Sequence, residues 1–452
     1  MFASKDALFA KSSGSYQISR SLRFRSSASA YLSRTPASAG NRKTWTWSGW
    51  VKRGTIATND ALFHVYGSAT TTTYFLLRFD STNSALYAGN SATNFFITTQ
   101  LFRDPSAWYH IVLTLDTTQA AATDRLKLYV NGQQVTSFSS DNRSAQITQN
   151  SDQGINQAAA HSIGRENSGT FYLDGYLAEV NFIDGSALTP SSFGAYDTNG
   201  VWQPARYTGS YGTNGFYLPF SDNSALTTAS NAGIGKDFSG NSNYWVTNNI
   251  SITAGTTYDS MIDSPTNYAD GGNGRGNYAT FNPLAVTSAA ATFADGNLTL
   301  TTGLAGGNCY GTFAIPTSGK WYWEITAGSA NGPMIGISAY LPTQTFAWQN
   351  GNSVFYYANG QKYVDGTGSA YGASYTINNV IGVAVDADAG TITFYKDNAT
   401  QGAITHAVSG LFPCLADGGS GTTDTFYANF GQRPFTYTPP SGFSALNTQN
   451  LP

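Results

Sequence analysis

The chain has 452 residues, which is too many for one compact core, so we expect two or three domains. Trp, Tyr and Phe (9, 28 and 27 residues) outnumber the charged residues (23 basic, 26 acidic), and this excludes a disordered chain because ample apolar surface can be buried. Glutamate is nearly absent and occurs as Glu166, Glu179 and Glu324, while Thr, Tyr, Gly, Ser and Asn abound. This composition predicts an all-β fold.

Charge is divided unevenly along the chain, although its formal net value is −3. Residues 1–60 hold ten basic side chains against two acidic ones, and the remainder holds 13 against 24. We expect the basic section to dock on an acidic protein surface, and the alternative is a solvated strand edge kept soluble by charge. Nucleic acid is not an expected partner, because no reader motif accompanies the charge. The docking candidates are Arg20, Arg23, Arg25, Arg34, Arg42 and Lys43.

Residues 1–18 are mostly small and polar and predict an N-terminal arm laid against a partner. The start of the chain lacks the apolar stretch of a secretory signal, and no run reaches the roughly 20 apolar residues that span a bilayer. The sequence therefore predicts synthesis in a cytoplasm, without a signal peptide and without a membrane span.

Residues 19–200 contain a series of strand-like segments separated by turn residues, which is typical of an antiparallel sandwich. In the first segment Leu22 and Phe24 alternate with Arg23 and Arg25, as a half-buried strand requires. We therefore expect one face of this strand to lie in the core and the other to face solvent.

The strongest local turn signal is Asn131-Gly132 in LYVNGQQV, because a tight hairpin turn needs positive φ at both central residues. Five segments in order resemble the laminin-G-like, concanavalin-type jelly rolls: LRF, TWSGWVK, WYHIVLTLD, LYVNG and LDGYLAEVNFIDGSAL. This resemblance implies a jelly-roll sandwich over residues 19–200.

Residues 201–283 are rich in Gly, Asn and Ser, and we expect a structured connector because a structureless loop of that length is unusual inside a compact protein. A second sandwich is expected over residues 284–438. Residues 439–452 form a Pro-bounded C-terminal tail.

The second sandwich carries the segments GKWYWEIT, IGIS, NVIGVAVDADAGTITFYKDN, LFPCLADG and YANFGQRPF. Trp321, Trp323 and Ile325 share one face of the first of these strands, and Tyr322 and Glu324 share the other. The order and chemistry of the segments resemble the SPRY family, whose sandwiches are recognition modules. The resemblance therefore implies binding rather than catalysis.

Recognition by such a module uses rim loops, with aromatic faces for contact and short polar groups for orientation. The candidate ligand-binding residues are Tyr340, Trp348, Tyr356, Tyr357 and Tyr363. A core role for most of them is the competing interpretation.

Catalysis is not expected. Jelly-roll hydrolases that resemble laminarinases carry carboxylates on alternate positions of one strand, flanking the bond to be cut. The nearest match is Glu179, whose strand face continues with Asn181 and Ile183, and these cannot donate a proton or attack a sugar. Pairs of aspartates remain open as an alternative. Cys309 and Cys414 are expected to pack as small apolar core residues.

No metal centre or cofactor is expected from the histidines, which show no ligand spacing; they are His64, His110, His161 and His406. His110 lies in an alternating strand and is interpreted as a structural histidine. The laminin-G resemblance implies possible calcium at rim carboxylates, for which the candidates are Asp80, Asp116 and Asp174. Asp174 is more simply explained as a turn former.

The sequence of the connector (residues 201–283) and the two sandwiches together resemble structural proteins of tailed bacteriophages. This resemblance implies a virion protein, a fibre or appendage subunit that adheres to the host surface by binding a glycan or receptor. It also implies contacts with other virion proteins and a homo-oligomer, for which a trimer is the expectation. The alternative is a capsid decoration or connector protein, and a polysaccharide depolymerase comes third.

Overall fold

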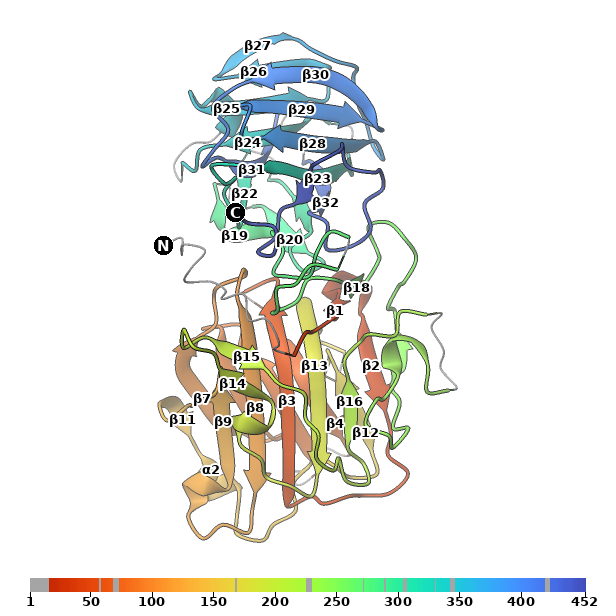
Figure 1. Ribbon diagram of the computed structural model, residues 1–452. Helices are drawn as coiled ribbons and strands as arrows, with labels where there is room; N and C mark the ends of the chain where they lie inside the picture. The colour runs from red at the N-terminus through yellow and green to blue at the C-terminus, as the bar shows by residue number, and fades with distance from the viewer. Residues whose placement is uncertain are drawn as a thin grey trace. The chain divides into compact units, whose positions relative to one another are not determined.

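The computed structural model divides the chain into two units (Figure 1). Unit 1 consists of Met1–Thr253 and Tyr258–Thr266, and unit 2 of Ala254–Thr257 and Asn267–Pro452. The structure describes residues 16–56, 58–67, 73–166, 169–224, 230–270, 272–287, 290–303, 307–329, 331–341, 346–418 and 423–452. Residues 1–15 of the predicted arm therefore lie outside the described residues.

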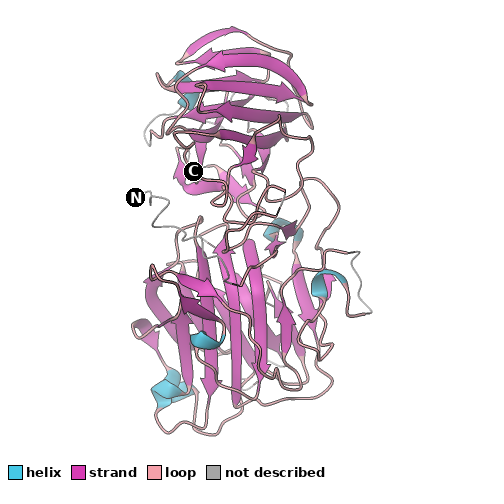
Figure 2. Ribbon diagram, viewed as in Figure 1, coloured by secondary structure: helices cyan, strands magenta, loops and turns pink. Residues whose placement is uncertain are grey.

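Strands dominate both units, which confirms the all-β prediction (Figure 2). The helical elements are short, and α2 (Arg143–Gln146) is a single turn. Among the described residues, no helix is long and apolar enough to cross a membrane.

Unit 1 is a β-sandwich whose first sheet, sheet A, has the strand order β10-β9-β8-β3-β13-β1-β18, with β16 also paired to β13. Neighbouring strands of this sheet run antiparallel. The strands are β1 (Ser21–Phe24), β3 (Thr44–Arg53), β8 (Trp108–Asp116), β9 (Leu126–Val130), β10 (Gln133–Gln134), β13 (Gly175–Asp184), β16 (Phe216–Leu218) and β18 (Ser260–Met261).

The second sheet of unit 1, sheet B, has the order β11-β7-β6-β5-β4-β12-β2-β17. Its strands are β2 (Tyr31–Arg34), β4 (Asp60–Tyr66), β5 (Tyr74–Phe79), β6 (Ala85–Gly89), β7 (Asn94–Leu101), β11 (Phe138–Asp141), β12 (Ala160–Ile163) and β17 (Val246–Asn248). Trp45 and Trp47 of sheet A meet Phe75 and Phe63 of sheet B, at ring-centroid distances of 5.6 Å and 6.4 Å. Inward-facing side chains of the two sheets thus form one core.

The outer face of sheet A is covered by residues that come later in the chain. The Thr46 hydroxyl donates to the Ser186 carbonyl and the Thr114 hydroxyl to the Leu188 carbonyl, both at 2.8 Å. A second apolar cluster fills the space between this face and its cover, and it contains Val112, Ile183, Phe193, Tyr211 and Tyr217. Both faces of the central strands β3 and β13 of sheet A are therefore buried.

The segment expected to connect the sandwiches belongs largely to unit 1. Residues 201–266 supply β16, β17 and β18 to the two sheets, and β15 (Trp202–Pro204) pairs with β14 (Gly194–Tyr196). The physical reason is the apolar outer face of sheet A, which would be exposed without this cover.

The prediction that β1 is half-buried is wrong, because its second face is also covered. Arg23 is 0% exposed and Arg25 is 8% exposed. Both guanidinium groups donate to Asp259, with Nε–Oδ1 distances of 3.1 Å and 2.8 Å. The docking role predicted for these two arginines is therefore wrong, because their charges are buried and compensated inside unit 1.

A further buried ion pair joins β3 to the returning segment. Lys52 Nζ lies 2.8 Å from Asp263 Oδ2, and both side chains are fully buried. The Trp108 indole donates to the other oxygen of Asp263 at 3.1 Å. Because the charges compensate each other in a low-dielectric interior, losing either partner leaves an isolated buried charge.

We predict that Lys52→Met lowers the free energy of unfolding by about 3–5 kcal/mol, because Asp263 would keep an uncompensated buried charge. The matched control is Lys127→Met. Lys127 pairs with Asp124 at 3.1 Å on the surface, so we expect a change within about 0.5 kcal/mol. Denaturant unfolding followed by Trp fluorescence measures both, and equal losses would contradict the role of the buried pair.

Unit 2 is a second sandwich of largely antiparallel strands. Sheet C has the order β19-β22-β31-β24-β25-β26-β27, and sheet D has the order β20-β21-β32-β23-β28-β29-β30, with β33 parallel to β23. Sheet C contains β19 (Phe281–Val286), β22 (Asn308–Gly311), β24 (Pro333–Ser338), β25 (Ser353–Tyr357), β26 (Gln361–Val364), β27 (Thr367–Ala370) and β31 (Phe412–Asp417). Sheet D contains β20 (Thr292–Ala294), β21 (Thr299–Thr301), β23 (Lys320–Ala327), β28 (Val380–Asp386), β29 (Thr391–Lys396), β30 (Ala399–Thr405), β32 (Thr425–Asn429) and β33 (Ser444–Ala445).

In unit 2 the chain also covers the outer face of a sheet. Glu324 lies on the outer face of sheet D, yet it is 2% exposed. The backbone N–H groups of Thr436 and Tyr437 donate to its carboxylate at 2.8 Å each. The predicted tail is also part of the sandwich, since β33 pairs with β23 and Leu446 is fully buried.

Cys309 and Cys414 are free and buried, as the sequence predicted.

Candidate ligand-binding groove

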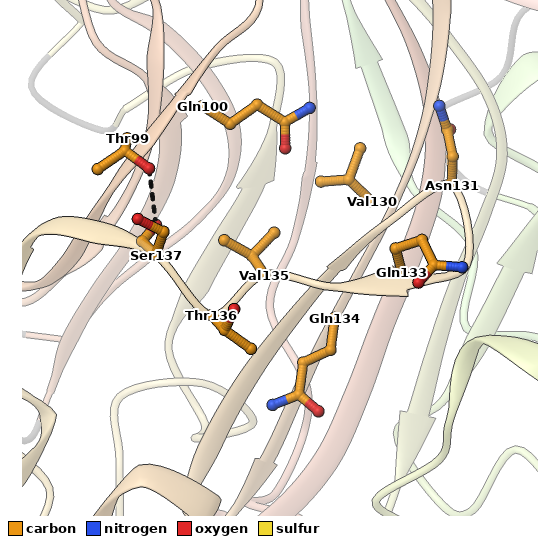
Figure 3. A pocket seen from close by; sticks show the side chains of 9 residues that line it. All are labelled: Thr99, Gln100, Val130, Asn131, Gln133, Gln134, Val135, Thr136 and Ser137. Carbon is orange, nitrogen blue, oxygen red and sulfur yellow. Dashed lines mark hydrogen bonds between the residues drawn. The ribbon is translucent and has the colours of Figure 1, made fainter.

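A groove of about 350 Å³ lies at the edge of unit 1, where the chain crosses from sheet A to sheet B (Figure 3). One wall is the end of β7, and the other is the β9–β10 hairpin with the segment leading to β11. The lining residues are Thr99, Gln100, Val130, Asn131, Gln133, Gln134, Val135, Thr136 and Ser137. None of them carries a charge, and seven of the nine have an amide or hydroxyl side chain.

The groove owes its shape to the Asn131-Gly132 turn. Both residues have positive φ, 47° and 81°, which confirms the hairpin predicted from the sequence. A Cβ at Gly132 would lie 2.5 Å from the Trp202 ring, so the turn needs glycine for space as well as for conformation. The Asn131 side chain is fixed because its Oδ1 accepts a hydrogen bond from the His110 backbone N–H at 2.8 Å.

An exposed aromatic ring stands beside the groove. Tyr196 is 45% exposed, and its hydroxyl donates to the Asn131 carbonyl and accepts from the Gln133 amide, both at 2.7 Å. Its ring packs edge-on against Trp202 at 4.9 Å. The contact with Trp202 and the two hydrogen bonds hold the Tyr196 ring in place, and much of the ring remains exposed to solvent.

Several polar groups of the groove are available to a ligand. The side-chain amides of Gln100 and Gln134 make no hydrogen bond within the described part of the chain, whereas Thr99 is bonded to the Ser137 carbonyl at 3.2 Å. Figure 3 shows Val130 and Val135 between these polar groups. Amides and hydroxyls around a small apolar patch, next to an exposed ring, suit a neutral polyhydroxylated ligand.

Sequence reasoning missed this groove. The Asn131-Gly132 turn was its one visible signal, and glutamine, threonine and serine near a turn are ordinary surface residues. Tyr196 contributes from a separate hairpin, 63 residues after Gln133, so no local pattern links the two.

Four of the five aromatics predicted for the second sandwich lie together on the outer face of sheet C. These four residues pack around one apolar cluster, and they are Tyr340, Trp348, Tyr357 and Tyr363. Trp348 and Tyr363 are in edge contact at 4.9 Å, and Tyr357 and Tyr363 at 6.2 Å. Tyr340 is the most open, at 39% exposed, and the other three are half-buried.

Tyr356 is the exception, and its predicted binding role is wrong. It is fully buried between the sheets, with its ring 5.5 Å from Phe394 of β29 and 4.9 Å from Tyr375. Alternation along β25 puts Tyr356 and Tyr357 on opposite faces, so neighbours in the sequence have different roles.

A buried Ser–His contact on sheet A is not arranged for nucleophilic catalysis. Ser48 Oγ lies 2.9 Å from His110 Nε2, and the Trp202 indole donates to His110 Nδ1 at 3.0 Å. Because an indole N–H can only donate, Nδ1 is an acceptor and the proton of neutral His110 sits on Nε2, where it points at Ser48. Burial lowers the pKa of His110 to about 3, so it stays neutral. His110 is thus a structural histidine.

Glu179, the nearest match to a catalytic carboxylate, is also closed off. It is 6% exposed and its carboxylate is bonded by the hydroxyls of Tyr16 and Tyr217. A sugar chain cannot reach it without displacing both tyrosines.

The three calcium candidates already have protein partners. Asp80 pairs with Arg78 at 3.0 Å, Asp116 accepts from Thr118 at 2.6 Å, and fully buried Asp174 accepts from the Ser26 hydroxyl. Across the described ranges, no group of three or more His, Cys, Asp or Glu side chains is placed to hold a metal ion.

The other basic residues of the predicted docking surface are half-buried and mostly bonded within unit 1. Arg20 donates to the Ser260 carbonyl at 3.2 Å, and Arg42 donates to the Gln153 carbonyl at 2.8 Å. Arg34 donates to the side-chain oxygen of Asn243. The Lys43 side chain is partly exposed to solvent.

We predict that Tyr356→Ala lowers the free energy of unfolding by about 3–5 kcal/mol, because it empties the space between the sheets of unit 2. Tyr363→Ala is the matched control on the neighbouring strand, and its half-exposed ring is expected to cost under about 1.5 kcal/mol. Thermal or denaturant unfolding of the full chain measures both. Similar losses for the two variants would refute the assignment of Tyr356 to the core.

Comparison with known proteins identifies the two sandwiches. Residues 26–194 match the model of the concanavalin A-like lectin/glucanases superfamily, and residues 320–433 match that of the SPRY domain. No curated protein sequence matches the chain.

Similar solved structures share low identity with the chain. The SPRY domain of human HERC1 is 20% identical, over 35% of this chain and 99% of that one, with a TM-score of 0.31. Another human SPRY domain is 18% identical, over 32% and 98%, with a TM-score of 0.28. A candidate carbohydrate-binding protein from Bacteroides ovatus is 17% identical, over 52% and 59%, with a TM-score of 0.33. By its family-model matches, the chain contains a concanavalin A-like domain followed by a SPRY domain.

Proposed function

We propose that the protein is a non-catalytic recognition protein that binds a neutral carbohydrate in the groove of unit 1. The observation that carries this proposal is the uncharged amide and hydroxyl lining beside the exposed ring of Tyr196. A sugar ring can stack on the aromatic face while its hydroxyls bond to Gln100 and Gln134. The closed environments of Glu179 and His110 support a binding role over hydrolysis.

Weak binding at an open groove calls for several copies. A millimolar contact is worth about 4 kcal/mol, which is too little for capture by one site. Repeating the site in an oligomer raises the avidity by orders of magnitude without new contacts. We propose a homo-oligomer, with a trimer as the first expectation.

We further propose that the protein is a fibre or appendage subunit of a tailed bacteriophage, made in the host cytoplasm and assembled with other virion proteins. The resemblance of both sandwiches and the intervening segment to phage structural proteins supports this role. The alternative, a decoration protein docked by its basic section, has less support, since Arg23 and Arg25 are buried and paired with Asp259.

The binding site is tested with the full-length protein and a panel of neutral and anionic oligosaccharides. We expect neutral members to bind and Tyr196→Ala to weaken that binding about tenfold, because it removes a ring contact worth roughly 1–1.5 kcal/mol. Tyr66→Ala is the matched control, because Tyr66 is 44% exposed on unit 1 and does not line the groove. Calorimetric titration gives the affinities. The proposal would be contradicted if no oligosaccharide of the panel bound, or if both variants lost the same amount of affinity.

The virion role is tested separately by locating the protein in purified particles with antibodies against unit 2. We expect labelling on a tail appendage. Labelling on the head surface would favour the decoration alternative, and absence from particles would refute both.

A further inference from the structure

Three oxygen-bearing side chains form a closed triangle on the outer face of sheet A. The Tyr16 hydroxyl lies 2.6 Å from the Tyr217 hydroxyl and 3.1 Å from Glu179 Oε2. The Tyr217 hydroxyl lies 2.8 Å from the same carboxylate oxygen. Each pair is within hydrogen-bond distance, so the triangle has three polar edges.

The number of protons in this triangle fixes its charge state. Two tyrosine hydroxyls supply two protons, whereas three hydrogen-bonded edges need three. All three edges carry a proton when Glu179 is protonated. When Glu179 is ionised, both hydroxyls can still donate to its carboxylate, but the Tyr16–Tyr217 edge is then left without a proton. The two oxygen atoms of that edge would then face each other with no proton between them. Such a contact between lone pairs is repulsive when it is buried.

Backbone geometry aims Glu179 into the triangle. The register of β13 against β3 shifts between Ala178 and Asn181, which is a β-bulge. Glu179 takes φ +52°, a conformation that non-glycine residues seldom adopt in a strand. The Asn181 amide donates to the Glu179 carbonyl at 2.9 Å and holds the bulge. Strain maintained in this way points to a specific role for the side chain.

The surroundings oppose a charge on Glu179. Burial raises its pKa to about 7, although the two tyrosine hydroxyls and Arg206 act in the opposite direction. Other titratable or charged groups face the site from the packed elements. They are Tyr207, Tyr211, His110, Asp237 (which accepts from the Tyr217 backbone N–H at 2.9 Å), the Arg23 and Arg25 pairs with Asp259, and the Lys52 pair with Asp263. Burial keeps His110 neutral, whereas burial of Glu179 raises the pKa of its carboxyl group into the neutral range.

Tyr16 connects this triangle to the N-terminal part of the chain. Two residues later, the Ile18 N–H donates to the Thr266 hydroxyl at 3.0 Å, and Arg20 donates to Ser260. These contacts attach residues 16–20 to unit 1. Tyr16 is the first residue of this attached segment. Opening the triangle therefore releases the segment from its Tyr16 end.

We propose that Glu179, Tyr16 and Tyr217 form a proton-dependent latch that holds residues 16–20 against sheet A and releases them as the proton is lost. In the closed latch burial raises the pKa of Glu179 to about 7, and opening the segment admits water and lowers that pKa toward the value of a free carboxyl group. The closed state therefore binds more protons than the open state in the acidic range below pH 7. The stability of the closed latch is greatest at acidic pH, falls as pH rises toward 7, and levels off above that.

The test is hydrogen exchange of the Ile18 amide in the full-length protein from pH 4.5 to 8.5, corrected for intrinsic exchange. We expect its protection factor to fall by up to about tenfold per pH unit until pH 7, then to level off. Glu179→Gln keeps a neutral group that donates and accepts, so its protection should stay constant with pH. Tyr217→Phe should lower protection at pH 5, where the closed triangle is complete.

Two controls separate the latch from other causes. Tyr211→Phe removes a neighbouring hydroxyl that bonds to Asn181 instead of Glu179, and it should follow the wild-type profile. Amides of β3 report global unfolding, and their pH dependence should differ from that of Ile18. A flat wild-type profile, a Glu179→Gln profile that matches wild type, or identical profiles for Ile18 and β3 would overturn the proposal.

Discussion

The structure of unit 1 depends on the sealing of the outer face of sheet A by the chain's own later residues. Thr46 and Thr114 bond to the backbone of the covering segment, Trp202 bonds to His110, and Lys52 is neutralised by Asp263. Lifting the cover would break these bonds and expose to water the apolar cluster beneath it, so polar and apolar contacts both hold the cover in place. A ligand would have to displace the cover to reach this face, whereas the edge groove is open to it.

Much of the fold was predictable because strand patterns are local. Alternation of apolar and polar residues gave the strands of both sandwiches, and Asn131-Gly132 gave the hairpin that shapes the groove. Alternation also shows which residues share a face, but it cannot show whether that face is covered. Arg23 was misjudged for this reason, since Asp259, which neutralises it, lies 236 residues further along the chain.

The candidate site was harder to predict than the fold. Aromatic residues drew attention to the second sandwich, where Tyr357 and Tyr363 do lie on one outer face while Tyr356 fills the core. The groove in unit 1 is made of residue types that every surface contains. Its distinguishing features, an uncharged lining and a ring supplied by a distant hairpin, exist only in three dimensions.

The groove and the covered face of sheet A are the basis for the proposal that the protein binds a sugar chain without cleaving it. The most direct measurement is a crystal structure of the full chain with a neutral oligosaccharide bound. The account predicts an uncleaved sugar in the groove, with one ring against Tyr196 and hydroxyls bonded to glutamine amides. A sugar seated on the outer face of sheet A with the cover displaced, or a cleaved product, would contradict it.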